Sequence, residues 1–402
     1  MTSLDARSPL IPRLMLPLAL FSAAPSQAGG LYLYETGTDD LGLATAGMAA
    51  RAQDPSVQLM NPAGLSHLEG RQLTVGGQLL YGDAPYDLDD PAQSDVDTVI
   101  GWFPAASFYY SQQLDERWSV GFATYGNFGL GLDYGDWAGK QQIKEATLLA
   151  LTMQPSLAYR IDEHWSLGAA LGVNYGLFAL TRDTNNGENK EDDSDWALNG
   201  KLGVLYEFNQ GTRIGLGYTS EVKYHFNIDR DIPLPSLPGE SARLSVTGLV
   251  NSPQQLMLSA YHQLTHDWAI MGNLGWQDWS KYNSNEVALP GRVITDKGMY
   301  KDTYHLALGV QHTLTPQWTL NGGIAYDSSA YEDQQNTSLT VPSGAAVRLG
   351  TGARYAFNPQ DSLGVAFEYL HMDGSSVELG DLSGHYPDPD FYFFAVNYHR
   401  RF

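Results

Sequence analysis

The stretch Ile161-Asp-Glu-His-Trp165-Ser-Leu-Gly-Ala-Ala-Leu-Gly-Val-Asn-Tyr-Gly-Leu177 joins a short polar turn to a run of alternating residues. Large apolar side chains fall at nearly every second position, and small or polar residues fill the positions between them. A period of two is that of a β-strand, whereas a helix repeats about every 3.6 residues. One apolar face and one small, polar face are typical of a strand between lipid and a polar lumen.

The polar turn recurs along the chain as an apolar residue, three mostly polar residues and, in most copies, a tryptophan. The copies begin at Leu114, Ile161, Phe208, Leu264, Leu314 and Phe357. Each interval has room for two strands and one longer loop, which is the unit of an up-and-down β-barrel. Tryptophans that return at one level indicate an aromatic girdle at a membrane interface. A soluble β-repeat with buried tryptophans is the alternative.

Counting these turns predicts the architecture. Six short turns, with both chain ends on the same side of the membrane, require fourteen strands. We expect them at residues 71–83, 97–112, 117–133, 146–161, 165–182, 194–208, 212–227, 243–262, 268–283, 302–314, 317–330, 344–357, 362–373 and 390–402. Each exceeds the roughly 9 to 11 residues that a tilted strand needs to cross the hydrocarbon layer. The sequence therefore predicts an all-β fold, a 14-stranded antiparallel transmembrane β-barrel over residues 71–402.

Both ends of the chain indicate export to the outer membrane of a Gram-negative bacterium. Residues 1–28 combine Arg7 and Arg13, a short apolar run and the small residues around Ala28, which predicts a signal peptide cleaved after Ala28. The last predicted strand ends in Phe402 and places most of its aromatic residues on one face. This ending resembles the C-terminal signature that the barrel-assembly machinery reads in bacterial outer-membrane proteins. We therefore expect that machinery, outer-membrane lipid and lipopolysaccharide as partners.

Charge and motif content argue against several other classes. A net charge of −22 disfavours nucleic acid as a partner. Acidic clusters such as Asp89-Asp90 and Asp192-Asp193 lack the glycine and terminal glutamate of an EF-hand loop. We interpret them as solvated loop acid and predict no metal and no other cofactor. Neither G-x-S-x-G nor H-E-x-x-H occurs, and His262 and His266 flank a turn, so we predict no catalytic residues and no enzyme activity.

Residues 29–70 do not follow the barrel pattern. A Gly/Ala-rich stretch from Leu41 to Ala52 precedes a turn-rich passage from Asn61 to Gly70, and neither contains a long apolar run. So long a stretch before the first strand predicts a compact plug folded inside the lumen. A flexible periplasmic extension is the alternative.

From about residue 30 to its end, the chain resembles the FadL/TodX-type family of outer-membrane channels for long-chain fatty acids and aromatic hydrocarbons. The residues that carry the resemblance are Ala46–Asp54 with Asn61, Pro62 and Ala63, then Tyr125–Tyr134, Gln154–Tyr159, Trp276–Tyr282 and Val341-Pro342. The first group resembles the family's N-terminal hatch, here residues 29–70, and the second its glycine-interrupted third strand. The family's fourteen strands agree with the count from the turns.

The resemblance implies that a hydrophobic substrate is captured outside, passes to a pocket near the N-terminus of the hatch, and leaves sideways through a gap in the wall. The gap would lie where Gly126, Gly129 and Gly131 interrupt the third strand. Glycines there also suit an ordinary bulge or a close fit around the plug. The substrate-binding residues that we predict on this basis are Leu31, Tyr32, Leu33, Tyr34, Phe128 and Leu130.

A fatty-acid carboxylate would need a cationic partner. The cations predicted on the lumen face include Lys201, Arg213, Arg348 and Arg354, and of these Lys201 and Arg348 are the candidate partners. Lumen cations also pair with acids of the plug or the wall, such as Asp39, Asp54 or Glu368. From all these features we expect a passive outer-membrane channel for hydrophobic small molecules, and the resemblance to the family implies a monomer. The alternatives are a porin for small polar solutes and a barrel lipid hydrolase.

Overall fold

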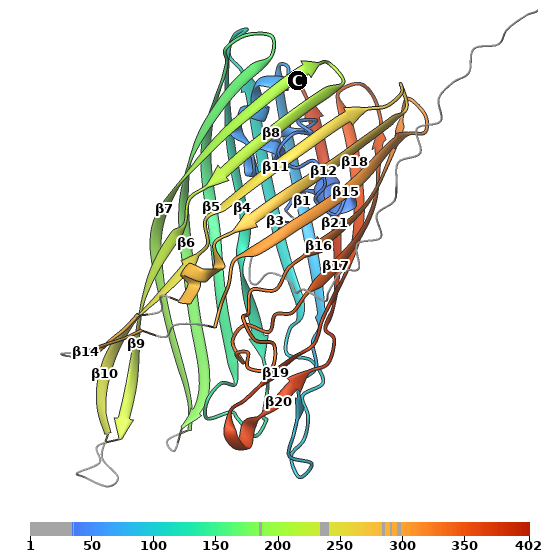
Figure 1. Cartoon of the computed structure of the whole chain (residues 1–402). Coiled ribbons are helices and arrows are strands. Elements are labelled where there is room, and N and C mark those ends of the chain that lie inside the picture. The colour runs from blue at the N-terminus through green and yellow to red at the C-terminus, as the bar shows by residue number, and fades with distance from the viewer. Residues whose placement is uncertain are drawn as a thin grey trace, which may run out of the picture.

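The structure is a computed structural model that describes residues 34, 36–184, 187–233, 241–283, 286–289, 292–295 and 299–402. The predicted signal peptide and the predicted binding residues Leu31, Tyr32 and Leu33 lie outside these ranges. Most of the described chain forms one closed antiparallel barrel (Figure 1). Among the described residues, no helix is long and apolar enough to cross a membrane.

The barrel has fourteen strands, which confirms the predicted fold. They are β1 (Arg71–Asp83), β3 (Gly101–Gln113), β4 (Trp118–Asp133), β5 (Glu145–Arg160), β6 (Trp165–Thr184), β7 (Gly187–Asn209), β8 (Thr212–Thr219), β11 (Gln255–Gln263), β12 (Trp268–Gln277), β15 (Thr303–Thr313), β16 (Trp318–Asp327), β17 (Ala346–Ala356), β18 (Asp361–Met372) and β21 (Asp390–Arg401). β21 closes the barrel against β1, from Gln72↔Arg401 to Asp83↔Asp390. Lipid offers the backbone no hydrogen-bonding partner, so this closure satisfies groups that an open edge would leave unpaired.

Two of the predicted strands are interrupted, which corrects the continuous ranges 212–227 and 243–262. The first divides into β8 and β9 (Val222–Pro233), and the second into β10 (Ser241–Ser252) and β11. Pro253, which has no backbone N–H to donate, lies in the break between β10 and β11. Beyond the break, β9 and β10 join β13 (Glu286–Leu289) and β14 (Arg292–Thr295) in a separate sheet, which leans away from the barrel in Figure 1.

Several short elements lie at the end of the barrel farther from the C-terminus (Figure 1). β2 (Asp87–Leu88), β19 (Ser375–Val377) and β20 (Gly384–Tyr386) form a small sheet there, beside the 3-10 helix η4 (Gly380–Leu382). A further 3-10 helix, η3 (Trp279–Asn283), follows β12 higher on the wall in Figure 1. Aromatic rings of this end pack on one another, namely those of Tyr86, Tyr134, Trp137 and Tyr386. The hydroxyl groups of Tyr134, just after β4, and Tyr386 in β20 also hydrogen-bond to each other, so segments distant in sequence are tied together there.

The repeated turn is held by a side chain that caps the backbone. In the first copy, Asp115 Oδ1 accepts hydrogen bonds from the backbone N–H groups of Arg117 and Trp118, both at 2.8 Å. These two donors stabilise the carboxylate and lower the pKa of Asp115 below its ordinary value. The tryptophans that close these turns are 40% to 46% exposed, namely Trp118, Trp165, Trp268 and Trp318. The alternative with buried tryptophans is therefore wrong.

Residues 36–70, which we call the N-terminal segment, fold inside the barrel (Figure 1). The segment contains α1 (Thr38–Gly42), η1 (Pro55–Leu59) and η2 (Pro62–His67). Both 3-10 helices begin at a proline, which needs no N–H partner there, and each has a capping side chain before it. Apart from Gln53, every residue from Thr36 to Ser66 is buried. β1 begins directly after the segment, at Arg71.

Glycines on the lumen face let the wall approach the backbone of the N-terminal segment. A Cβ on Gly215 would collide with the carbonyl oxygen of Ala49, and one on Gly323 with that of Leu43. Similar collisions with backbone atoms of the segment would arise at Gly168, Gly217 and Gly350. At these positions, the small residue on the lumen face is explained by the close approach of the segment's backbone and not by a wide water channel.

Replacement of Gly323 by valine tests this packing. Because the new side chain meets backbone and not a movable side chain, we expect it to displace the N-terminal segment at a cost of about 3 kcal/mol or more. Arg51, which is buried in the native barrel, should then become cleavable by trypsin in the folded, outer-membrane-inserted protein.

Gly322→Val is the matched control. A Cβ on Gly322 would meet only Val310 Cγ1, at 3.9 Å, so this variant should resist trypsin like the wild type. Equal resistance of both variants would show that the segment does not depend on the close approach at Gly323.

Candidate functional site

The barrel wall is interrupted between β3 and β4. Their ladder runs from Gln113↔Ser119 to Phe108↔Thr124 and stops there. Beyond it, β3 continues to Gly101 paired with β1, and β4 continues to Asp133 paired with β5. The backbone N–H of Asp133 donates to the carbonyl of Val99 at 2.8 Å and rejoins the two sides. We call the interruption between residues 101–107 and 125–132 the wall gap.

Exposure of β3 also marks the wall gap. Pro104, Ala105 and Ala106 are exposed in succession, whereas side chains of a strand paired on both sides alternate between two faces. Proline lacks an N–H and within sheets is confined to edges or strand ends. Pro104 therefore indicates, from the sequence alone, that β3 has an unpaired edge here. The predicted site residues did not include it.

The three glycines predicted at a lateral gap lie on the β4 side of the wall gap. The β4–β5 register shifts between Gly126 and Phe128. Gly129 has a φ of 132° and a Cβ there would collide with the carbonyl oxygen of Leu148, so only glycine fits. A Cβ on Gly131 would meet the ring of Phe103 across the gap at 3.5 Å. The bulge and the gap therefore coincide, and the nearest neighbours of these glycines are in β3 and β5, not in the N-terminal segment.

A largely apolar pocket opens at the wall gap and reaches the N-terminal segment. It is lined chiefly by Leu80, Phe103, Ala105, Ala106, Gly126 and Phe393, with Thr36 from the segment. Gln78 Nε2 donates to the carbonyl of Thr36 at 3.0 Å and so ties the start of the segment to β1 beside the pocket. The pocket thus lies between the start of the segment and the gap in the wall.

Buried aromatic rings occupy the lumen beside the N-terminal segment. We call them the aromatic cluster: Tyr34, Tyr109, Tyr125, Phe128, Tyr224, Phe226, Trp279, Tyr282, Tyr300 and Tyr331. Two of the predicted binding residues, Tyr34 and Phe128, belong to this cluster, and a third, Leu130, packs against it. The ring centroid of Phe128 lies 6.4 Å from that of Trp279, and Tyr34 Oη accepts a hydrogen bond from Gln277 Nε2 at 2.7 Å. The structure therefore brings together the predicted binding residues that it describes.

The Asn61-Pro62-Ala63 motif locks the N-terminal segment to the wall. Pro62 starts η2, and Asn61 Oδ1 accepts a hydrogen bond from the backbone N–H of Ala63 at 3.0 Å. Asn61 Nδ2 donates to the carbonyl of Ala49 at 2.7 Å and to that of Val204 in β7 at 3.0 Å. One fully buried amide thus joins two parts of the segment to a barrel strand.

The two predicted cationic residues already have protein partners. Arg348 bridges β16 and β18, because its Nε donates to Asp327 at 2.5 Å and its Nη1 to Glu368 at 3.0 Å. Lys201 Nζ donates to the carbonyl of Leu59 at 2.6 Å and to Tyr125 Oη at 2.9 Å. Arg348 therefore pairs with acids of the wall, as the alternative for lumen cations predicts, and Glu368 is one of them. Lys201 instead hydrogen-bonds to uncharged groups.

Two further cations that were predicted to face the lumen, Arg354 and Arg213, contact the segment. Arg354 pairs with Asp39 at 3.0 Å, and Arg213 Nε donates to the carbonyl of Ala50 at 2.6 Å. The pair of Arg354 with Asp39 follows the predicted pairing of lumen cations with plug acids, whereas no local pattern indicates the carbonyl of Ala50 as the partner of Arg213. In the described ranges, no group of three or more His, Cys, Asp or Glu side chains could hold a metal ion.

These features define a class of protein, a closed outer-membrane barrel with a filled lumen and an interrupted wall. The family model for outer membrane protein transport proteins (OMPP1/FadL/TodX) matches residues 19–402. The chain belongs to this family, and it is an outer-membrane transport protein of a Gram-negative bacterium, as the sequence predicts.

Individual relatives are similar to this chain over nearly its whole length. The long-chain fatty acid transport protein of Escherichia coli K12 is 24% identical over 420 residues, covering 92% of this chain and 93% of the relative. The 47 kDa outer membrane protein of Pasteurella multocida is 29% identical over 391 residues, covering 87% and 88%. Among solved structures, a Pseudomonas aeruginosa FadL homologue has a TM-score of 0.78 at 16% identity, covering 93% of this chain and 100% of that one. The Pseudomonas putida toluene transporter TodX has a TM-score of 0.68 at 16% identity, covering 92% and 99%.

Replacement of Asn61 by alanine should loosen the N-terminal segment. It leaves two buried carbonyls and the N–H of Ala63 without their partner, which should cost about 2 kcal/mol. Hydrogen exchange should become faster between residues 49 and 63 and at Val204, while the rest of the wall stays protected. Asn358→Ala, which removes a capping group from an exposed turn, is the control and should leave exchange in the segment unchanged. Unchanged exchange in the Asn61 variant would contradict the role assigned to this amide.

Proposed function

We propose that this protein takes up hydrophobic molecules passively and releases them sideways into the outer membrane through the wall gap. The observation that carries the proposal is the interrupted β3–β4 ladder with an apolar pocket beside it. An apolar molecule that left the barrel into water would lose its favourable surroundings, whereas a lateral exit keeps it in contact with apolar groups. The aromatic cluster supplies such groups inside the lumen.

The substrate class follows from the relatives and from the cluster. Relatives are named as long-chain fatty acid transport proteins or as a toluene transporter. Both kinds of molecule present apolar surface that aromatic rings can contact. We propose Tyr34, Phe128 and Leu130 as binding residues, with Leu31, Tyr32 and Leu33, which lie outside the described residues, as their continuation. Gly126, Gly129 and Gly131 border the exit.

The domain assignment supports the same mechanism. We propose that residues 1–28 are removed as a signal peptide, that residues 29–70 are the hatch, and that residues 71–402 form the barrel. A buried segment tied to the wall by Asn61 and Arg213 obstructs the lumen, which argues against a porin for polar solutes. We further propose a monomer without catalytic activity, surrounded by outer-membrane lipid and lipopolysaccharide and inserted by the barrel-assembly machinery.

A disulfide across the wall gap tests the exit route directly, because the chain contains no cysteine of its own. Continuing the β3–β4 register beyond Phe108↔Thr124 places Ala106 opposite Gly126. In the variant Ala106→Cys with Gly126→Cys, oxidation should close the gap and lower uptake of labelled oleate and labelled toluene about tenfold or more. Reduction with a membrane-permeant thiol should restore uptake in the same cells.

The matched control joins strands that are already paired. Ala353 and Val365 are partners in the β17–β18 ladder, so a disulfide between cysteines at these positions should leave uptake unchanged. Full uptake through the oxidised Ala106/Gly126 variant would refute lateral exit through the wall gap. Uptake by cells with the gene no faster than by cells without it would refute the hydrophobic channel itself.

A further inference from the structure

The connection between β16 and β17, residues 328–345, differs from an ordinary surface loop. Most of its residues are buried, among them Ser329, Ala330 and Tyr331 at 0% exposure and the Val341-Pro342 pair. Loops normally run over a protein's surface, where water satisfies their backbone groups. We call these residues the outer loop, because they lie at the end of the barrel that carries the longer connections (Figure 1). In outer-membrane barrels that end faces outside.

The outer loop belongs to the hydrophobic core that contains the aromatic cluster. Ala330, Tyr331 and Val341 of the loop are members of this core, and so is Leu59 of the N-terminal segment. The ring centroids of Tyr331 and Tyr300 lie 4.7 Å apart. One core therefore runs from the segment through the cluster to the outer loop. Because every ring of the cluster is buried, a molecule that arrives from outside reaches the cluster only if part of its cover moves.

The hydroxyl group of Tyr331 joins the two halves of the outer loop. Tyr331 Oη donates to the carbonyl of Val341 at 2.8 Å and accepts a hydrogen bond from the backbone N–H of Ser338 at 3.2 Å. It also lies 3.2 Å from Tyr300 Oη. A side chain, rather than a long ladder of backbone pairs, thus gives the loop its closed form.

Scattered hydrogen bonds attach the outer loop to its neighbours. The backbone N–H of Thr337 donates to the carbonyl of Ser376 in β19, and that of Ser376 donates to the carbonyl of Gln334, both at 2.8 Å. Tyr134 Oη donates to the carbonyl of Leu339 at 2.8 Å. The adjoining strand β17, by contrast, pairs along its whole length with β16 and with β18. Since local opening occurs where the fewest contacts must break, the outer loop is the part of the cover that moves most readily.

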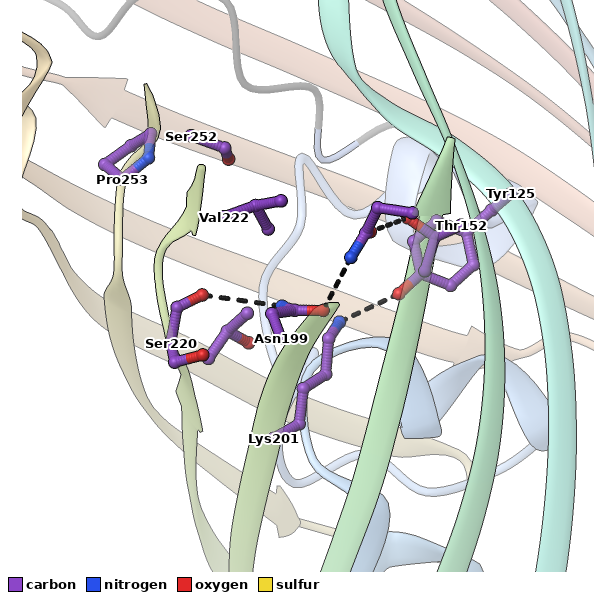
Figure 2. Close-up of a pocket in the computed structure, with 10 residues that line it drawn as sticks. Tyr125, Thr152, Asn199, Lys201, Ser220, Val222, Ser252 and Pro253 are labelled. Atoms are coloured by element: carbon purple, nitrogen blue, oxygen red, sulfur yellow. Dashed lines mark hydrogen bonds between the residues drawn. The ribbon is translucent and has the colours of Figure 1, made fainter. Parts of the chain in front are cut away.

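The break between β8 and β9 is a poorer entrance. The cavity there has a volume of about 20 Å³, enough for one water-sized group (Figure 2). Its lining is polar and hydrogen-bonded, since Lys201 donates to Tyr125 Oη at 2.9 Å and Asn199 Nδ2 donates to the carbonyl of Ser220 at 3.4 Å. An apolar molecule that passed here would leave these buried polar groups without partners, which is unfavourable.

We propose that the outer loop is a lid over the aromatic cluster, and that a hydrophobic molecule enters the lumen when this lid lifts. The inference rests on the proposed uptake of hydrophobic molecules and adds an entrance to it, since the wall gap is the exit. The arriving molecule replaces the apolar contacts that Val341 and Tyr331 make with the cluster. The Val341-Pro342 pair, part of the resemblance seen in the sequence, thereby acquires a role at the contact between lid and cluster.

A disulfide between the lid and β19 tests the entrance. Thr337 Oγ1 and Ser375 Oγ lie 3.3 Å apart, so Thr337→Cys with Ser375→Cys brings two sulfur atoms within bonding reach. Oxidation of cells that carry this variant should lower uptake of labelled oleate and labelled toluene about tenfold or more, because the lid cannot lift. Reduction with a membrane-permeant thiol should restore uptake in the same cells, which shows that the variant is folded.

The matched control is a disulfide in the same small sheet that leaves the lid free. Ser376 and His385 are partners in the β19–β20 ladder, so oxidation of the variant Ser376→Cys with His385→Cys should leave uptake unchanged. Full uptake through the oxidised Thr337/Ser375 variant would overturn the lid.

A photoactivatable oleate analogue separates entry from exit. In cells whose wall gap is closed by the oxidised Ala106/Gly126 pair, the analogue should still enter and label peptides that contain Phe128 or Trp279. In cells with the oxidised Thr337/Ser375 pair, this labelling should fall about tenfold, because the molecule is stopped before the cluster. Equal labelling in both would also contradict the lid. If the reduced variants take up no more than cells without the gene, the proposed function fails instead.

Discussion

Backbone hydrogen bonding in lipid is the constraint on which the rest of this structure depends. A strand that crosses a membrane must pair on both sides, because the hydrocarbon layer cannot replace a missing partner. The pairing of β1 with β21 meets this demand and makes the chain a closed wall. The wall gap is a departure from it, bounded at one end by the last pair, Phe108↔Thr124, and at the other by the bond from Asp133 to Val99. A local break of this kind is costly, which is why we connect it with transport rather than with folding.

The N-terminal segment makes the lumen side of the wall equally constrained. Backbone touches backbone at Gly215 and Gly323, so neither partner can move without the other. Ion pairs add to this packing: Arg354 of the wall pairs with Asp39 of the segment at 3.0 Å, and within the segment the buried Arg51 pairs with Asp40 at 2.9 Å. Removing one partner from such a pair leaves an uncompensated buried charge, which strongly destabilises a protein. The segment is therefore held in the lumen by close packing and by ion pairs. It obstructs the lumen although no disulfide links it to the wall.

Hydrogen bonds connect the regions that we assign to transport. Lys201 of β7 contacts the carbonyl of Leu59 in the segment and the hydroxyl of Tyr125 in β4. Tyr125 in turn donates to Gln154, whose amide donates to the carbonyl of Gln58. The strand that borders the wall gap, the segment, β5 and β7 thus share one polar network.

The features of this protein that can be predicted from its sequence are those that depend on a local residue pattern. Alternation with a period of two and the capped turns before Trp118 and Trp165 determine the strands, their faces and their number, since each depends on residues close together in the chain. Glycines such as Gly129 also mark the third strand as irregular. The break after Thr219 is not visible in the sequence, because Val222 and Tyr224 continue the alternation of Leu216 and Tyr218. The break before Gln255 is marked by Pro253 in a polar run, a signal that the predicted range 243–262 did not use.

Only the tertiary structure determines the contacts between residues that are far apart in sequence. Examples are the hydrogen bond of Thr45 with His305, at 2.7 Å, and the partners of Lys201. A strand pattern specifies which side chains face the lumen, but not which of them meet the same part of the segment. Nor does it specify where a ladder between two good strands stops. Both depend on the register of the closed barrel and on the path of the segment inside it, which no local stretch of this sequence contains.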